Sequence, residues 1–314
     1  MFQFTEGYFK AVFLKVAPAF LAVLAVTVAT SAIAGEPKPW GIGLQDAATP
    51  VKREVHEFHN LLMVLMTGVV VVVLGLLLFV MFRFNEKANP EPSKVTHNAL
   101  IEVIWTVVPV CILLVIALPS FKILYFMDRV ADPDMTLEVT GYQWGWSYKY
   151  PDHGDIEFNA DMIQSADMNE YFPDGNGRRL LETYNPVVLP VDKNIEILVT
   201  ARPNDVIHSW AMPAFGIKKD AVPGRLNHTW AKVEKTGVYF GQCSEICGES
   251  HAFMPISIYV VSEEEFTDWV DCVQNDESGA FYPSRACVRK LDLDKYRTPL
   301  KDVQRLEFAR AQSE

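Results

Sequence analysis

The stretch GQCSEICGESHAFMP, residues 241–255, places two cysteines, a histidine and a methionine close together. A disulfide between Cys243 and Cys247 would give no role to His251 or Met254. A structural zinc site takes cysteine and histidine, but not usually a thioether. Thiolate, imidazole and thioether form a soft ligand set that selects copper. The stretch therefore predicts a copper site, which needs a second histidine from elsewhere in the chain.

That second histidine is His208, in NDVIHSWAMP, at the end of the alternating pattern NIEILVT. One histidine at a strand end, followed by a cysteine, a histidine and a methionine on one returning loop, resembles a cupredoxin. A blue-copper site uses one cysteine, whereas this loop has two. Two sulfurs can bridge two copper ions, each capped by one histidine, with Met254 on one ion and a backbone carbonyl of the loop on the other.

The segment 131–262 has the pattern of an all-β sandwich. Apolar residues alternate in TLEVTGYQW, NIEILVT and ISIYVV, and period two indicates half-buried strands. Turn-rich stretches such as FPDGNGRR and AVPGR separate these runs. We therefore expect a cupredoxin-like sandwich that carries the copper loop.

The tail, residues 263–314, begins as a helix. Ser262 with Glu265 three residues later is a capping box, and acidic residues fill the first turn. Residues 288–314 are charge-mixed, which favours an exposed helix or a loose tail. In an oxidising compartment Cys272 and Cys287 form a plausible disulfide, worth roughly 3 kcal/mol in the chain-entropy model.

Two apolar runs precede the sandwich. The run at 61–82 has no charged residue, and as a helix it would be about 33 Å long, enough to cross a hydrocarbon core of about 30 Å. The run at 100–126 is charged only at Glu102 near its start and Lys122 near its end. Segment 35–130 is therefore predicted to be a transmembrane helical hairpin.

Residues 1–34 have the form of a cleavable signal peptide. Lys10 and Lys15 precede an apolar run, and the small residues around Ile33 match a signal peptidase site. After cleavage the new N-terminus lies outside, so two crossings place everything after residue 126 outside as well. The formal net charge of -11 argues against nucleic acid as a partner and favours a basic one.

Two long motifs, HSWAMPAFGIKKDAVPGRLN and GQCSEICGESHAFMPI, give a closer resemblance. Over roughly residues 40–262 the chain is similar to subunit II of cytochrome c oxidase, of the bacterial type in the haem-copper superfamily. The resemblance implies a dinuclear copper centre, CuA, and cytochrome c as the electron donor, because quinol-oxidising relatives lack these ligands. The implied ligands are His208, Cys243, Glu245 through its carbonyl, Cys247, His251 and Met254.

The resemblance also implies roles outside the copper ligands. Trp144 corresponds to the residue through which electrons enter from cytochrome c. The alternative is that Trp144 and Trp146 both lie in the core of the sandwich. Glu102 corresponds to the mouth of a proton pathway in subunit I, or is an acid favoured by the helix dipole. The Glu245 side chain corresponds to a ligand of Mg2+ or Mn2+ at the interface with subunit I.

Cytochrome c presents lysines, so its docking face on this chain should be acidic. Asp205 and Asp155 correspond to docking positions of the family, and Glu157 and Asp152 are nearby candidates. Lys149 stands where relatives often have a carboxylate, so the patch is expected to differ in detail.

The implied function is the electron-input subunit of cytochrome c oxidase. It would accept electrons from cytochrome c at CuA and pass them to haem in subunit I, where O2 reduction is coupled to proton pumping. Subunits I and III and membrane lipid would be its partners. It would lie in the bacterial inner (cytoplasmic) membrane, with its C-terminal domain in the periplasm.

Two alternatives come from other classes of protein. A membrane-anchored copper-binding or assembly protein would need exposed, exchangeable ligands. A thiol oxidoreductase usually has two residues between its cysteines, whereas Cys243 and Cys247 are separated by three.

Overall fold

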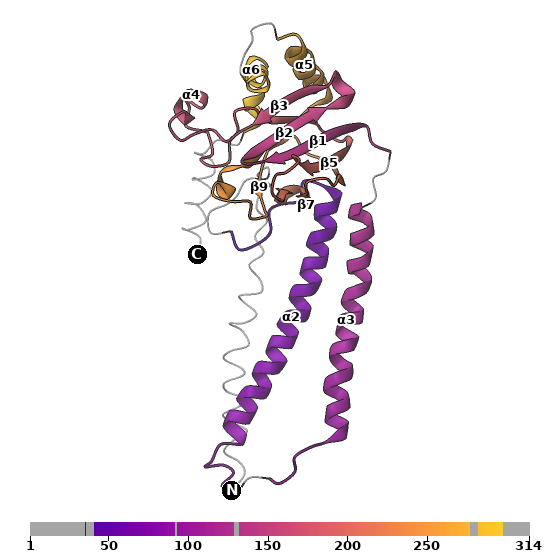
Figure 1. Cartoon of the computed structure of the whole chain (residues 1–314). Coiled ribbons are helices and arrows are strands. Elements are labelled where there is room, and N and C mark those ends of the chain that lie inside the picture. The colour runs from indigo at the N-terminus through magenta and orange to yellow at the C-terminus, as the bar shows by residue number, and fades with distance from the viewer. Residues whose placement is uncertain (1–34, 36–40, 92, 129–131, 277–281, 298–314) are drawn as a thin grey trace. The chain divides into compact units, whose positions relative to one another are not determined.

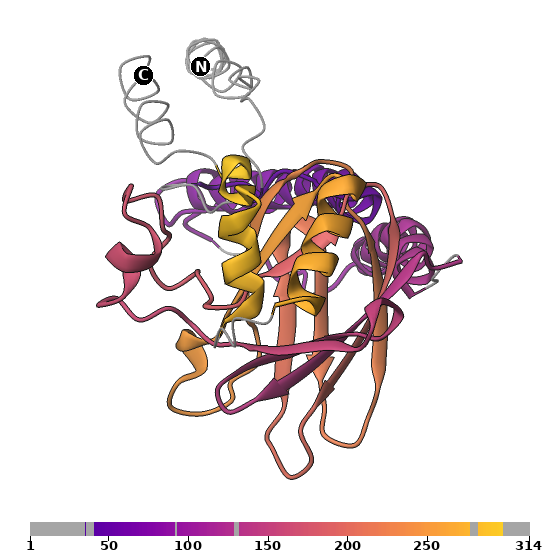
Figure 2. The same ribbon diagram turned by 90° about the horizontal axis from the view of Figure 1, so that it is seen from above.

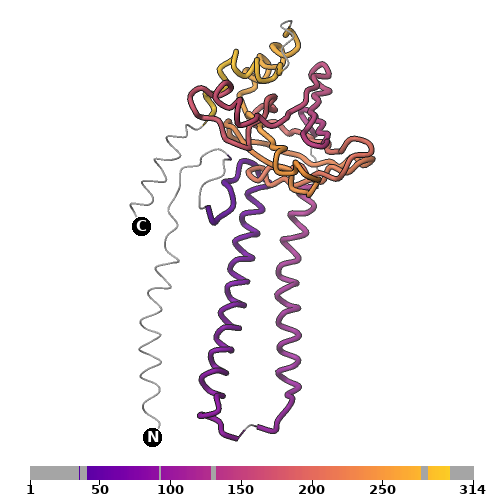
Figure 3. The backbone as a smooth tube through the Cα atoms, turned by 60° about the vertical axis from the view of Figure 1, so that its left-hand side comes forward, coloured from indigo at the N-terminus to yellow at the C-terminus, as the bar shows by residue number. Residues whose placement is uncertain are grey.

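The computed structural model describes residues 35, 41–91, 93–128, 132–276 and 282–297. The expected signal peptide at 1–34 and the end of the tail at 298–314 lie outside these residues. Two long helices come first, α2 (Pro50–Arg83) and α3 (Ala99–Asp128). They run side by side as a hairpin, as Figures 1 and 3 show. Both are long and apolar enough to cross a membrane, and their apolar middle parts are exposed. The predicted hairpin is confirmed.

Helix α2 begins well before the apolar run predicted at 61–82. Thr49 caps it, because its hydroxyl accepts from the Lys52 N–H at 3.1 Å, and Pro50 occupies the first helical position. The same hydroxyl donates to the carbonyl of Phe215 at 2.7 Å. Arg53 forms an ion pair with Glu234. The first turns of α2 are therefore attached to the β domain, and only the later turns are available to the membrane.

Helix α3 meets the β domain at its other end. The indole N–H of Trp230 donates to the carbonyl of Phe126 at 3.1 Å, and the two rings lie edge to face. Lys122, expected to reach the interface, lies 3.1 Å from the Glu54 carboxylate of α2. The start of α2 and the end of α3 are thus joined to each other and to the β domain.

The β domain consists of two five-stranded sheets, ordered β3-β2-β1-β5-β8 and β4-β10-β9-β6-β7. Strand β1 pairs in parallel with β5, and β4 pairs in parallel with β10. The strands are β1 (Met135–Tyr142), β2 (Gly145–Tyr150), β3 (Ile156–Ala160), β4 (Val187–Pro190), β5 (Asn194–Ala201), β6 (His208–Met212), β7 (Ile217–Ala221), β8 (Asn227–Lys232), β9 (Gly237–Cys243) and β10 (Pro255–Val261). Short helices connect them: η1 (Pro151–His153), α4 (Met168–Tyr171), η2 (Pro213–Phe215) and η3 (His251–Phe253).

The alternation read from the sequence corresponds to the core. In β1, Leu137 and Val139 are fully buried, and in β5 every second residue from Ile195 to Val199 is buried likewise. Their side chains fill the space between the sheets, where each large apolar side chain contributes about 1.5–3 kcal/mol on burial. The predicted all-β sandwich is confirmed.

The C-terminal extension folds onto this sandwich. It comprises α5 (Glu263–Gln274), α6 (Pro283–Lys290) and η4 (Leu293–Tyr296), and Figure 2 shows α5 and α6 side by side over the β strands. The predicted capping box is present, and Phe266 and Trp269 of α5 are buried. Cys272 and Cys287 are joined by the expected disulfide.

Residues 288–297 differ from the exposed helix or loose tail expected for them. Val288 and Leu293 are fully buried, and the Arg297 guanidinium donates to both oxygens of Glu182 at 2.7 Å. Arg285 lies 4.0 Å from the same carboxylate and 3.1 Å from the Tyr259 hydroxyl. Arg289, Lys290, Asp292 and Lys295 are exposed as expected, but the Arg297 charge is buried against Glu182, which the composition of the segment does not reveal.

The Glu265 carboxylate gives a pH prediction for this extension. Burial raises its pKa, but bonds from Lys295, Tyr296 and Ser262 outweigh this and lower the pKa to about 2. Its contribution is therefore present above about pH 4.5 and lost as the pH falls towards 2. We expect Glu265→Gln to cost up to about 1 kcal/mol at neutral pH, because glutamine can keep the capping box but loses the ion pair with Lys295. Thermal unfolding should show the difference shrinking in acid; a difference independent of pH would contradict the assignment.

Candidate metal centre

Three elements bring the predicted ligands together. His208 is the first residue of β6 and Cys243 is the last residue of β9, and these strands pair antiparallel through Trp210 and Cys243. The loop between β9 and β10 carries the other ligands and folds back onto this strand pair. Ligands 35 or more positions apart in the sequence therefore meet at one end of the second sheet.

The ligand atoms form a compact cluster. The two cysteine sulfurs are 3.9 Å apart. The Cys247 sulfur lies 3.4 Å from Nδ1 of His251 and 3.6 Å from the sulfur of Met254. The Cys243 sulfur lies 3.3 Å from the Glu245 carbonyl, and the ligand atoms of His208 and both cysteines lie within 4.8 Å of one another. All six predicted ligands thus contribute to one cluster.

Burial of the cluster fits a bound metal. His208 is fully buried, yet neither of its ring nitrogens has a hydrogen bond among the described residues. Buried polar atoms without partners are rare and require an explanation. Since Nε2 faces Asp205 at 3.4 Å, Nδ1 is the nitrogen left for a metal. The thiol, imidazole and thioether donors match the preferences of copper.

The protonation states of the metal-free cluster follow from the same burial. Burial lowers the pKa of His208, and the nearby Asp205 opposes this shift only in part, so the imidazole is neutral and can bind a metal. Burial, followed by the neighbouring Cys243, raises the pKa of Cys247 to about 12. Metal binding must therefore displace a thiol proton.

Two glycines make room around the cluster. A side chain at Gly141 would meet the His208 ring at 3.0 Å, so glycine lets β1 lie against this ligand. Gly248 has a positive φ of 119°, and a side chain there would meet the Trp144 ring at 3.1 Å. Glycine at these two positions allows the turn between β1 and β2 to lie directly on the copper loop.

That turn consists of Gln143 and Trp144. The Trp144 indole N–H donates to the carbonyl of Cys247 at 3.1 Å, and the Gln143 side-chain amide donates to the same carbonyl at 3.0 Å. Trp144 is half-buried, whereas Trp146 is fully buried and donates to the carbonyl of Met254. Trp146 is thus a core residue, and Trp144 joins the surface to a ligand residue.

Comparison with known proteins places the whole arrangement in a family. The family model described as the cytochrome c oxidase subunit II periplasmic domain matches residues 135–261, and the one for its transmembrane domain matches residues 37–123. The chain belongs to the cytochrome c oxidase subunit II family. Members of this family are subunits of an oxidoreductase complex, and the periplasmic domain implies copper binding at CuA.

Individual relatives agree with this membership. A probable cytochrome c oxidase subunit 2 of Rickettsia bellii is 51% identical over 237 residues, covering 76% of this chain and 86% of the relative. Cytochrome c oxidase subunit 2 of Triticum aestivum is 44% identical over 242 residues, covering 77% and 92%. The crystal structure of the periplasmic domain of subunit II from Bradyrhizobium japonicum is 50% identical, with a TM-score of 0.40, and covers 46% of this chain and 95% of that one.

Asp205 of this subunit II chain lies beside the turn that carries Trp144, with its carboxylate turned inward. Its side chain is only 12% exposed, and both of its oxygens are engaged. Oδ2 accepts from the Gln143 N–H at 3.1 Å and Oδ1 from the Val206 N–H at 2.7 Å. Sequence spacing placed Asp205 near His208 correctly, but could not show that its carboxylate turns inward.

The other acidic candidates of subunit II are exposed, but lie far from Trp144. Asp152 and Asp155 follow β2, whereas Trp144 precedes it, and a six-residue strand is about 20 Å long. Asp155 also forms an ion pair with Lys149 at 2.8 Å. Glu157 lies opposite Lys149 on β3. The structure therefore does not bring these acids to the copper loop.

The contacts of Glu102 and Glu245 within this chain do not test the roles that the resemblance implies for them. Those roles stay predictions. Glu102, in the first turn of α3, accepts from the Asn98 N–H at 3.3 Å, as a helix-capping acid does. The Glu245 side chain is half-exposed, while its carbonyl faces Cys243. The half-exposed Glu245 carboxylate is accessible to a neighbouring chain.

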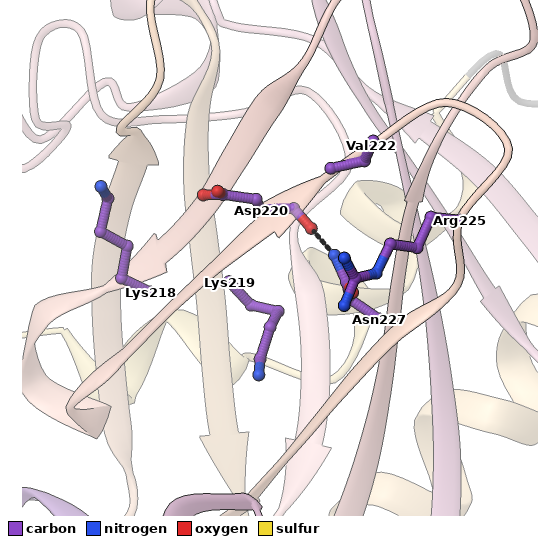
Figure 4. Close-up of a pocket in the computed structure, with 6 residues that line it drawn as sticks. All are labelled: Lys218, Lys219, Asp220, Val222, Arg225 and Asn227. Atoms are coloured by element: carbon purple, nitrogen blue, oxygen red, sulfur yellow. Dashed lines mark hydrogen bonds between the residues drawn. The ribbon is translucent and has the colours of Figure 1, made fainter. Parts of the chain in front are cut away.

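A separate recess of about 440 Å³ lies along β7 and the turn that follows it (Figure 4). The Asn227 amide donates to the carbonyl of Asp220 across it at 2.7 Å. None of its lining residues belongs to the copper cluster: they are Lys218, Lys219, Asp220, Val222, Arg225 and Asn227. This recess is basic, unlike the face expected for cytochrome c.

Proposed function

We propose that this subunit accepts electrons from cytochrome c at a dinuclear copper centre and delivers them to haem in subunit I. There they would support O2 reduction coupled to proton pumping. The observation that carries the proposal is the convergence of two thiols, two imidazoles, a thioether and a carbonyl in one buried cluster beneath Trp144.

The two cysteines take the bridging role in this proposal. Their sulfurs, 3.9 Å apart, face the same interior space, with His251 on one side and His208 within ligand distance. Met254 and the Glu245 carbonyl each lie beside one sulfur. When bound, two copper ions supply a one-electron couple whose charge is shared between them.

The protein holds the proposed copper ligands rigidly and keeps water away from the sulfurs. The cluster spans two paired strands and a loop held by the Cys243 N–H and the Trp146 indole, both of which donate to the carbonyl of Met254. Cys247 and Met254 are almost fully buried. Water is therefore excluded from these two sulfurs, and they have little freedom to move when the charge changes.

Both alternative functions fit the site less well. A copper-delivery protein needs exposed and exchangeable ligands, but His208, Cys243 and Cys247 are all buried. A thiol oxidoreductase needs a lowered cysteine pKa, whereas burial raises the pKa of Cys247. Electron transfer through a bound metal requires neither exposure nor a reactive thiolate.

The remaining parts of the chain complete the proposal. Segment 1–34 is a cleaved signal peptide, 35–130 anchors the subunit in the bacterial inner membrane, 131–262 carries copper in the periplasm, and 263–314 is a C-terminal extension. Subunits I and III and membrane lipid are its neighbours. Glu102 lies at a proton pathway mouth, and the Glu245 side chain binds Mg2+ or Mn2+ together with subunit I. Asp205 contributes charge to cytochrome c docking beside Trp144, and Asp152, Asp155 and Glu157 contribute outlying charge.

Copper loading tests the central claim. The full chain in detergent, reduced and then given copper, should bind two ions per chain and show the EPR signal of one unpaired electron shared by both. The physical reason is that two thiolates shared by the two ions would let one unpaired electron spread over both. One copper ion per chain with a blue-copper spectrum would contradict the dinuclear assignment.

A further inference from the structure

The Asp205 carboxylate connects two parts of the copper site. Oδ1 accepts from the Val206 N–H and lies 3.4 Å from Nε2 of His208, without a well-formed hydrogen bond in the metal-free protein. Oδ2 accepts from the N–H of Gln143 in the turn between β1 and β2. One nearly buried side chain thus contacts a ligand and a neighbouring turn at the same time.

Gln143 continues the connection to a second ligand. Its side-chain Nε2 donates to the carbonyl of Cys247 at 3.0 Å. Because the backbone N–H of Gln143 is bound to Asp205 and its side chain to Cys247, this residue joins the two across the cluster. The result is a chain of contacts from His208 through Asp205 and Gln143 to Cys247.

We propose that Asp205 and Gln143 are positioning residues that fix His208 relative to Cys247 and so set the electronic structure of the copper centre. We call these two residues the bracket. This inference rests on the proposed copper site, but it goes further, since it gives Asp205 and Gln143 a role in holding the copper ligands. Gln143, exposed at the tip of the turn, has a function that its sequence position did not suggest.

The physical basis is the general behaviour of metal-bound histidine. A ligating imidazole usually donates its second ring N–H to a carboxylate, and this contact fixes the orientation of the ring. With Nδ1 on the metal, Nε2 of His208 carries a proton and faces Asp205 at a distance that a small ring movement would make a hydrogen bond. At the other end, two donors hold the Cys247 carbonyl and hence the direction of its side chain.

Two substitutions that keep the size of the side chain distinguish a positioning role from a docking role. Asp205→Asn replaces an acceptor oxygen by a donor amide and removes a negative charge, whereas Gln143→Glu replaces a donor by an acceptor and adds one. If the residues act through docking charge, the two changes should affect cytochrome c binding in opposite directions. If they act as the bracket, both should disturb the copper site in the same direction, without cytochrome c present.

We expect both variants to release copper faster than the unchanged chain. Loss of an outer contact to a metal ligand typically weakens metal affinity by about 10–100-fold. The measurements are copper release to a chelator, the EPR hyperfine pattern and the reduction potential, all on the full chain in detergent. Glu157→Gln is the control, because it also removes one negative charge, at an exposed position far from the copper loop, and should leave all three quantities unchanged.

The outcomes distinguish this inference from the proposed function. If the unchanged chain binds no copper, the proposed function fails first. If it binds two ions, but both variants keep its spectrum and release rate, the bracket does not exist. Thermal unfolding of the metal-free chains checks folding, and Gln143→Glu remains informative even if Asp205→Asn fails to fold, because Gln143 is exposed.

Discussion

Replacing Trp144 with alanine should slow electron transfer from bound cytochrome c to copper by orders of magnitude, with the copper spectrum almost unchanged. Trp144 is half-buried, and its indole N–H is bound to the carbonyl of the ligand residue Cys247. Its loss removes the most direct route from the surface to the cluster, while Gln143 still holds that carbonyl. Stopped-flow reduction at several ionic strengths separates the transfer step from binding.

Two further variants give this experiment its controls. Trp144→Phe keeps an aromatic ring but removes the N–H donor, so it shows whether the ring or the hydrogen bond carries the effect. Glu157→Gln removes an exposed charge and should alter only binding and its salt dependence. Normal transfer in bound Trp144→Ala would show that electrons enter elsewhere and that Trp144 serves only for packing.

The ligand set could be predicted from the sequence because it depends on residue types at close spacing. Cysteine, histidine and methionine within one loop restrict the metal by their chemistry, and only His208 had to be found at a distance. Membrane helices and alternating strands were predictable for a similar reason, since periodicity follows directly from burial. The capping box at Ser262 is likewise a local pattern, and the structure contains it.

Side-chain direction could not be predicted in the same way. Asp205 was placed near the copper site by its spacing from His208, yet only the fold shows its carboxylate turned towards the Gln143 N–H. Asp152 and Asp155 were expected on the docking face, but β2 carries them to the end of the strand opposite Trp144. Residues close in sequence are far apart in space when an extended strand lies between them.

The start of α2 shows which local signals were overlooked. Hydropathy marks only the part of a helix that enters the membrane, so it gave a start near residue 61. Thr49 followed by Pro50 is itself a helix-start pattern, and the helix begins there. Its first turns contact the β domain instead of lipid, and for that reason they are polar.

The burial of Arg297 was not predictable from composition, and it leads to a large expected effect. Glu182→Gln should destabilise the β domain by about 3–5 kcal/mol, because breaking a buried ion pair leaves an uncompensated charge. Glu182 is completely buried, and its carboxylate accepts two hydrogen bonds from Arg297 and one from the Arg178 N–H. Urea denaturation of residues 132–314, produced as a separate domain, would measure the loss.

The source of this loss can be established with Arg297→Met and the double variant. If the ion pair is the stabilising unit, the double variant should cost clearly less than the sum of the single changes, because neither charge is then left without its partner. Additive effects would show instead that each side chain stabilises the domain through its own packing. Glu157→Gln, at an exposed position, should change the free energy of unfolding by no more than about 0.5 kcal/mol. A strong coupling would mean that the C-terminal extension is held to the sandwich by charge buried between them, as well as by the disulfide between Cys272 and Cys287.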